Sequence, residues 1–257
     1  MNKKELIKEA IFNHKKTGYT DGLVLHLDGI YNTRNGHNAN SNVWEDLSGN
    51  NYDFSYHFLA NNSLWTDKSY SLNGGYNRTL VCNTAIMSGF TQATIEVRYK
   101  TNTTQNTWIF QNRSNSNVEG CFQMCTTLNR SVTAGNIYKA NGNCVYIEEG
   151  NVNNDLNKQY TVSFSYNNGA FKIYTNGVLK QTAEYFKSSY GGTNQERITD
   201  ADFAEIASRT VYSLGSGLPW TAGFGMNGEI YSVRIYPVAL SENEILNNYD
   251  IDNKRFG

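Results

Sequence analysis

Acidic residues on predicted strands decide whether this sequence could cleave glycosidic bonds. Most glycosidases hold two carboxyl groups across the bond, one of them kept protonated. Here Glu96 and Glu229 each stand singly on a strand, and Glu148 and Glu149 would point to opposite faces because they are adjacent. The spacing therefore predicts no retaining glycosidase site.

Aromatic residues among amides suggest a different chemistry, the binding of sugars. Aromatic faces stack on sugar rings, and amides hydrogen-bond the hydroxyl groups. Four aromatic residues lie in Gly-, Asn- or Thr-rich surroundings typical of loops: Trp65, Trp108, Tyr190 and Trp220. We predict that these four contact carbohydrate. The alternative is that the tryptophans are partly buried packing residues.

Oxygen-bearing side chains recur through residues 46–53, as they do in calcium loops. The predicted calcium ligands are Asp46, Ser48, Asn50 and Asp53. Ca²⁺ takes six to eight oxygens, however, and no bidentate Glu follows at the expected distance. The alternative is that Asp46 only caps its own turn by binding backbone N–H groups.

Four cysteines could bind zinc or form disulfides. Cys121, Cys125 and Cys144 would supply three zinc ligands, but no spacing matches a zinc finger. In a long chain without an export signal, all four, Cys82 included, are predicted to be buried thiols.

Charge and hydropathy exclude two classes of partner. The chain has 22 basic and 23 acidic residues, and no stretch concentrates Lys or Arg. This balance predicts no nucleic-acid partner. The N-terminus begins with lysines but lacks the apolar run of an export signal, and no segment is apolar enough to predict a membrane span.

The secondary-structure pattern predicts many short strands and few helices. The sequence holds 36 Asn, 22 Gly and 2 Pro, and both Asn and Gly tolerate the positive φ of tight turns. Residues 23–28, 94–100 and 229–236 alternate apolar and polar side chains. In the second of these, Glu96, Arg98 and Lys100 are predicted to face water. Asn-Gly turns make residues 159–184 a three-stranded meander.

Helices are predicted near both ends of the chain. Residues 3–15 carry an apolar stripe, and we assign 1–18 to an N-terminal helix or anchor and 19–257 to a single domain. A second helix is predicted over 200–207. Beyond Pro237, Ser241 and Glu244 form a capping box that predicts a short C-terminal helix, with Leu240 packed on Ile245.

Four segments in order resemble one known family. They are G-L-V-L-H-L-D at 22–28, W-E-D-L-S-G-N-N at 44–51, Y-T-N-G-V-L at 174–179, and the closing strand and helix at 224–245. These resemble laminin-G-like domains of the concanavalin A-like lectin/glucanase jelly rolls. The resemblance implies an all-β, two-sheet antiparallel sandwich whose first and last strands are neighbours, with Leu25 and Val233 in one core. Such domains usually bind sugars or proteins.

Two shorter segments resemble motifs of jelly-roll alginate lyases. They are residues 95–98 and residues 185–190. A third motif, with a His between them, is missing, because all four His precede Arg98. The E-x-D-x-x-E string of the glucanase branch is also missing. We therefore predict that the protein is not an enzyme, and that Glu96 and Arg98 form the wet face of an ordinary strand.

A lectin-like domain without an export signal fits a protein that reaches cell surfaces by lysis of its host. The first two matched segments also resemble lectin-type domains of phage structural proteins. We predict a bacteriophage virion protein, made in the host cytoplasm, that decorates the capsid or tail and binds host-surface polysaccharide. Its partners would be other virion proteins, through the N-terminal helix, or further copies of itself. The alternatives are a polysaccharide lyase or hydrolase and a bacterial carbohydrate-binding module.

Overall fold

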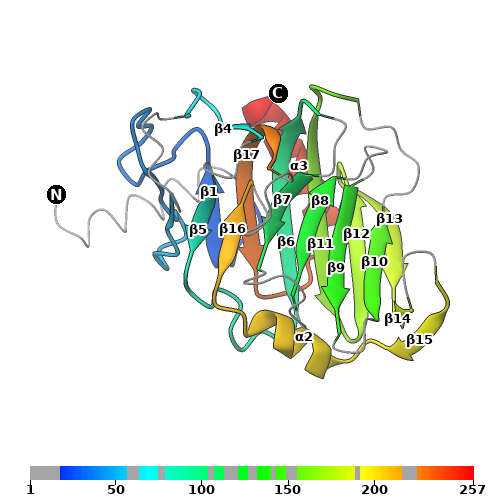
Figure 1. The fold of residues 1–257 in the computed structure, drawn as a ribbon. Coiled ribbons are helices and arrows are strands. Elements are labelled where there is room, and N and C mark those ends of the chain that lie inside the picture. Colours follow the sequence, from blue (N-terminus) through cyan, green and yellow to red (C-terminus); the bar gives the residue numbers. More distant parts are fainter. Residues whose placement is uncertain are drawn as a thin grey trace.

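Two antiparallel β-sheets packed face to face form the protein (Figure 1). The computed structural model describes residues 18–56, 64–74, 79–103, 107–112, 121–126, 132–139, 143–148, 155–188, 192–215 and 225–257. The predicted helix over 3–15 lies outside the described residues. The predicted all-β, two-sheet jelly-roll sandwich is confirmed.

The first sheet has seven strands, and the first and last strands of the described chain lie side by side in it. Its order is β1-β17-β6-β11-β12-β13, with β4 also paired to β17. The strands are β1 (Leu25–Asp28), β4 (Tyr70–Asn73), β6 (Ala93–Thr101), β11 (Gln159–Asn167), β12 (Ala170–Thr175), β13 (Val178–Ala183) and β17 (Asn227–Tyr236). Leu27 pairs with Val233, and both Leu25 and Val233 lie in the core. The predicted neighbourhood of first and last strands is confirmed.

The second sheet has ten strands. Its order is β15-β14-β10-β9-β8-β7-β16-β5-β3-β2. The strands are β2 (Val43–Trp44), β3 (Phe54–Tyr56), β5 (Leu80–Cys82), β7 (Thr107–Gln111), β8 (Gln123–Thr126), β9 (Val132–Tyr138), β10 (Cys144–Glu148), β14 (Tyr185–Lys187), β15 (Asn194–Arg197) and β16 (Tyr212–Leu214).

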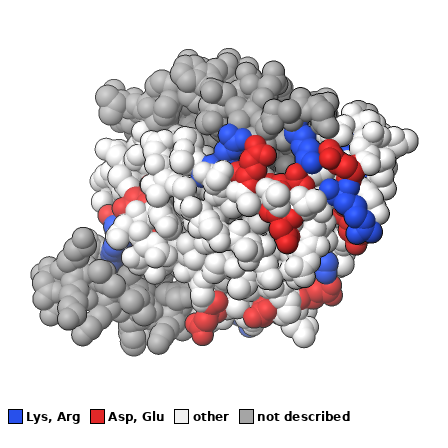
Figure 2. All heavy atoms as spheres, turned by 90° about the horizontal axis from the view of Figure 1, so that it is seen from below, with Lys and Arg blue, Asp and Glu red and all other residues white. Residues whose placement is uncertain are grey.

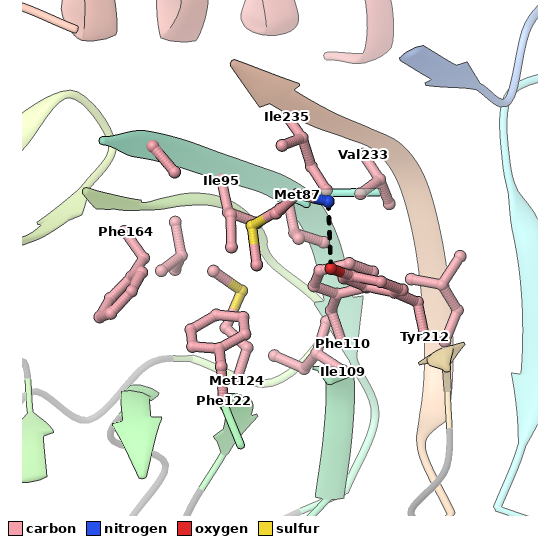
Figure 3. Close-up of a cluster of buried hydrophobic side chains, with 14 of the residues drawn as sticks. Met87, Ile95, Ile109, Phe110, Phe122, Met124, Phe164, Tyr212, Val233 and Ile235 are labelled. Carbon is pink, nitrogen blue, oxygen red and sulfur yellow. Dashed lines mark hydrogen bonds between the residues drawn. The ribbon is translucent and has the colours of Figure 1, made fainter. Parts of the chain in front are cut away.

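The core fills the space between the sheets (Figure 3). Ile95 and Val233 reach it from the seven-stranded sheet, and Phe110 and Tyr212 from the ten-stranded sheet. The Tyr212 hydroxyl accepts a hydrogen bond from the Met87 backbone N–H at 3.3 Å. Tyr212 therefore buries its ring without leaving its polar atom unpaired.

Two Asn-Gly turns set the register of the meander β11-β12-β13. Asn168 and Gly169 have φ of 46° and 75°, and Asn176 and Gly177 have 51° and 79°. Type I′ hairpin turns, whose twist matches that of the strands, need positive φ at both central residues. The meander predicted over 159–184 is confirmed.

Two helices are described, and both begin at capping boxes. The first, α2 (Asp200–Ala207), starts after Thr199, and the second, α3 (Glu242–Phe256), starts after Ser241. The Ser241 hydroxyl accepts from the Glu244 backbone N–H at 3.3 Å, and its own backbone N–H donates to the Glu244 carboxylate at 2.8 Å. The Ser241 hydroxyl also donates to the Glu244 carboxylate at 2.7 Å, and this bond, with the one from the Ser241 backbone N–H, lowers the pKa of Glu244.

We expect Ser241→Ala to lower the free energy of unfolding by about 1 kcal/mol, because one N–H of the first turn loses its acceptor. Urea denaturation measures the change. Ser188→Ala, at an exposed position, serves as the control and should stay within about 0.5 kcal/mol of the parent. Equal stabilities of the two variants would contradict a role for the cap.

Helix α3 covers the outer face of the seven-stranded sheet (Figure 1). As a result β6 is buried on both faces, with Glu96 at 0% exposure and Arg98 at 2%. The prediction that Glu96 and Arg98 face water is wrong. Strand alternation identified their face correctly, but the helix that packs on it replaces water with protein.

Candidate functional site

The charges beneath α3 form a buried network centred on Arg234. Its Nε donates to Glu96 Oε2 at 3.0 Å, and its two terminal nitrogens donate to Asp252 of α3 at 2.7 and 2.9 Å. All three side chains have no exposure. The paired geometry of guanidinium and carboxylate makes this a strong charge-assisted contact. It ties α3 to the centre of the sheet.

The pKa values of Glu96 and Asp252 shift in opposite directions, although both carboxylates contact Arg234. Burial raises the pKa of Glu96 despite the nearby Arg234. Burial also acts to raise the pKa of Asp252, but the charge and the two hydrogen bonds of Arg234 outweigh it and lower that pKa overall. Asn248 of α3 adds a 2.8 Å bond to Glu96. Both carboxylates are therefore engaged by protein groups, and neither is open to a ligand.

Glu229, the other single acidic residue considered from the sequence, is engaged as well. It pairs with Lys100 at 2.6 Å and accepts from Tyr231 at 2.7 Å and Ser69 at 3.0 Å. Its burial raises the pKa, and the bonds to Lys100, Tyr231 and Ser69 lower it further than burial raises it. Glu229 thus forms an ion pair between β6 and β17.

The outer face of the ten-stranded sheet holds a row of polar side chains. Ser213 of β16 pairs with Gln111 of β7, and Gln111 pairs with Gln123 of β8. Their strand neighbours, including Phe110 and Met124, point into the core, so these three point the other way. We call Ser213, Gln111 and Gln123 the outer-face row.

Within this row, Gln123 stands out because its amide has no partner. Gln111 Nε2 donates to Ser213 Oγ at 3.0 Å. Gln123 is 0% exposed, yet neither its amide oxygen nor its amide nitrogen has a hydrogen-bond partner. Leaving a buried amide unpaired costs about 1–3 kcal/mol. Few such groups occur in native proteins, and each calls for a partner that is missing, such as a ligand or a water.

Trp108 lies beside the outer-face row. It pairs with Cys125, two residues from Gln123 on the same face of β8, and is half-buried. The structure thus brings one of the four predicted sugar-binding aromatics close to the unpaired amide of Gln123. An aromatic ring beside hydrogen-bonding amides can hold the ring and the hydroxyl groups of a sugar.

The other predicted aromatics do not join this site. Trp65 packs edge-on against Trp44, with ring centres 5.1 Å apart, and its Nε1 donates to the Ser41 carbonyl at 2.9 Å. Tyr190 and Trp220 lie outside the described residues. Sugar contacts at these three positions stay predictions.

The loop predicted to bind calcium is held by its own hydrogen bonds. Asp46 is buried and accepts from the backbone N–H groups of His26, Ser48 and Tyr52 at 2.9–3.1 Å and from the Ser48 hydroxyl at 2.8 Å. Burial raises the pKa of Asp46 more than these bonds lower it. Asp53 accepts from the Asp46 backbone N–H at 2.8 Å.

Asn50 and Ser48 complete the loop by bonding to the Val24 carbonyl, at 2.9 and 2.7 Å. Asp46, Ser48 and Asn50 thus anchor the loop to residues 24 and 26 at the first strand, and Asp53 holds the loop by its bond to Asp46. Calcium binding stays a prediction, and the ion would have to compete with these bonds. Among the described residues, no cluster of three His, Cys, Asp or Glu side chains has the geometry of a metal site.

The lyase-like segments and the cysteines are the remaining candidates from the sequence. Glu96 lies on β6 of the seven-stranded sheet, whereas residues 185–187 form β14 of the ten-stranded sheet, so the two lyase-like segments do not meet. The four cysteines are buried and form no disulfide, which confirms that part of the prediction.

Surface charges at the α2 end of the molecule are mixed in sign (Figure 2). Lys139 pairs with Glu196 at 3.1 Å and Asp202 at 3.0 Å, and Arg209 pairs with Glu205 at 3.3 Å. Across the described part of the chain, neither helix is long and apolar enough to span a membrane.

The sequence alone did not identify Ser213, Gln111 or Gln123. Each alternates with buried apolar neighbours, and this pattern marks them as outward-facing. Their strands are separated by up to about a hundred residues, however, and nothing local shows that they pair. The pairing is a property of the folded sheet.

Solved structures of sialidases and of a sialidase CBM40 share this fold. Trypanosoma rangeli sialidase in complex with sialic acid matches with a TM-score of 0.66 and 15% identity, over 98% of this chain and 39% of that chain. Ruminococcus gnavus IT-sialidase CBM40, bound to α2,3-sialyllactose, matches with a TM-score of 0.53 and 16% identity, over 71% of this chain and 96% of that one. No family model and no curated protein sequence matches the chain.

These comparisons correct one prediction. The lack of glycosidase and lyase motifs led us to predict that the protein is not an enzyme, but the structures sharing its fold include sialidases, which are enzymes. Missing motifs therefore do not place this fold outside enzymes. This chain spans about two fifths of the length of the sialidase chain cited above.

Proposed function

We propose that this protein is a lectin-like domain that binds carbohydrate at the outer-face row. The observation that carries the proposal is Gln123, a fully buried amide without a partner, next to Gln111 and the half-buried Trp108. A sugar hydroxyl that displaces the groups covering Gln123 can donate to its amide oxygen and accept from its amide nitrogen. The CBM40 neighbour, described as bound to α2,3-sialyllactose, supports sialylated glycans as the first ligands to test.

The test measures binding of α2,3-sialyllactose by calorimetry, after a glycan array to widen the ligand set. We expect Gln123→Leu to weaken binding about tenfold, the value of one hydrogen bond of roughly 1.4 kcal/mol. The same variant should keep or gain stability, because it removes an unpaired buried amide. Trp108→Ala should weaken binding at least as much.

Gln195→Leu is the matched control, because Gln195 is exposed on β15 at the far edge of the same sheet. It should leave affinity unchanged. Full binding by Gln123→Leu and Trp108→Ala together, or no binding to any glycan on the array, would overturn the proposal.

The sialidase neighbours favour a second candidate, a role in cleaving sialylated glycans. It rests on the fold shared over 98% of this chain. Release of fluorophore from a 4-methylumbelliferyl sialoside by the protein tests this role directly. A protein that binds sialyllactose but releases no fluorophore would contradict the cleaving role and keep the binding function.

The virion location is a proposal from the sequence alone, and the comparisons add no support to it. If it holds, mass spectrometry of purified phage particles should detect this chain among their proteins. Genes for glycosidases beside its own gene, in place of portal and tail genes, would favour a bacterial carbohydrate-binding module.

A further inference from the structure

A surface hollow lies at the edge of the sandwich where the chain passes from one sheet to the other. It is lined from β13, β14 and β15 by Gln181, Thr182, Glu184, Tyr185, Lys187 and Asn194. Glu184 alone separates β13, the last strand of the seven-stranded sheet, from β14 of the ten-stranded sheet. The hollow is separate from the outer-face row, because β9 and β10 lie between β8 and β14.

Four polar side chains around this hollow are not used by the fold. Within the described residues, the side chains of Thr182, Glu184, Lys187 and Asn194 take part in no hydrogen bond or ion pair. They represent a hydroxyl, a carboxylate, an ammonium and an amide. Most of the other lysines and carboxylates described above form ion pairs or hydrogen bonds. These four side chains, gathered around one hollow, do not.

An aromatic ring and a second cation adjoin these groups. Phe186 is buried in the core, so Tyr185 and Lys187 lie on the opposite face of β14. Arg197 pairs with Tyr185 across β14 and β15, and its guanidinium lies 5.1 Å from the centre of the Tyr185 ring. Lys187 pairs with Asn194 in the same ladder.

The charge around the hollow favours an anionic ligand. Lys187 and Arg197 contribute two positive charges against one negative charge from Glu184, and neither cation has a carboxylate partner among the described residues. A carboxylate can pair with Lys187, while the hydroxyl groups of a sugar ring can bond to Asn194 and Glu184. A neutral sugar would leave both cations unpaired.

We propose that this hollow is a second binding site, specific for a sugar that carries a carboxylate, such as a uronate residue of an acidic polysaccharide. The carboxylate lies at Lys187 and Arg197, and the sugar ring lies against Tyr185. The proposal does not depend on the outer-face row, which uses different strands and uncharged groups.

The test uses the whole chain and two matched probes, tetragalacturonate and its methyl ester. The ester keeps the sugar rings and removes the negative charges. Calorimetry should show binding of the acid, at least about tenfold weaker binding of the ester, and weaker binding of the acid as salt concentration rises. Lys187→Gln should weaken binding of tetragalacturonate by about the same factor as esterification.

Lys68→Gln is the control, because Lys68 is an exposed lysine outside the hollow. It should leave binding of tetragalacturonate unchanged. Unchanged melting temperatures confirm that both variants are folded. Equal binding of acid and ester, equal effects of the two lysine variants, or no binding of tetragalacturonate at millimolar concentration would each overturn the proposal.

Discussion

Replacing Arg234 by Met lowers the free energy of unfolding by about 3–5 kcal/mol, because it leaves buried carboxylates without their cation. Glu96 and Asp252 are both fully buried, and Arg234 makes three hydrogen bonds to them. A loss of this size is a large fraction of the roughly 5–15 kcal/mol that stabilises a typical protein. Guanidinium denaturation measures this loss, provided that the slope of unfolding free energy against denaturant concentration is the same in parent and variant.

The same variant should change how stability depends on pH. In the parent, the pKa of Asp252 is lowered, so its contribution is present above the unfolded pKa and is lost as pH falls. In Arg234→Met, burial without the cation raises the pKa of Asp252 above its unfolded value and raises further the pKa of Glu96, which is already raised in the parent. Their contribution is then present at low pH and lost as pH rises. The difference between parent and variant should therefore shrink toward acid pH.

Arg209→Met provides the control. Arg209 pairs with Glu205 on the surface of α2, where the two side chains are 22% and 48% exposed. Exposed pairs of this kind contribute about 0–1 kcal/mol. If Arg234→Met cost no more than Arg209→Met at neutral pH, the network beneath α3 would not hold the helix on the sheet.

Gly228→Ala is the second variant with a large expected effect, a loss of roughly 3 kcal/mol or more from strain and overlap. Gly228 has φ of 156°, which side chains rarely adopt, and lies in β17 opposite Thr101 of β6. A Cβ at this position would overlap the Lys100 carbonyl oxygen and lie 2.9 Å from the Thr101 Cα. Both are backbone atoms of the central strand and cannot move aside cheaply.

Gly36→Ala is the matched control. Gly36 also has positive φ, 110°, but a Cβ there would meet nothing within 4 Å. It carries the conformational cost without the overlap, so its loss of unfolding free energy should be clearly smaller than that of Gly228→Ala. Thermal unfolding of the two variants side by side measures the difference. Equal losses would show that backbone conformation alone, and not close packing of β17 on β6, requires glycine at 228.

Gly228 and Arg234 explain part of the closing segment that resembles laminin-G-like domains. Gly228 allows β17 to approach β6, and Arg234 joins the sheet to α3. Ser241 and Glu244 begin that helix at its capping box, and Leu240 packs with Ile245 in one cluster. The segment therefore encodes one structural unit, a last strand and the helix that covers it.

The sequence determined what depends on near neighbours along the chain. Alternation predicted the strands, two Asn-Gly pairs predicted the meander turns with positive φ, and Ser241 with Glu244 predicted the start of the last helix. Each of these is set within a few residues, because turn conformation and capping bonds are local.

Only the tertiary structure decided what covers each face of a strand and which distant strands pair. Alternation gives Glu96 a polar face, but the packing of α3 makes that face dry and turns an expected surface charge into a buried ion network. In the same way, pairing of β16, β7 and β8 brings Ser213, Gln111 and Gln123 into one row. The physical reason is that period and propensity fix the direction of a side chain, whereas burial and partnership depend on contacts between segments far apart in the chain.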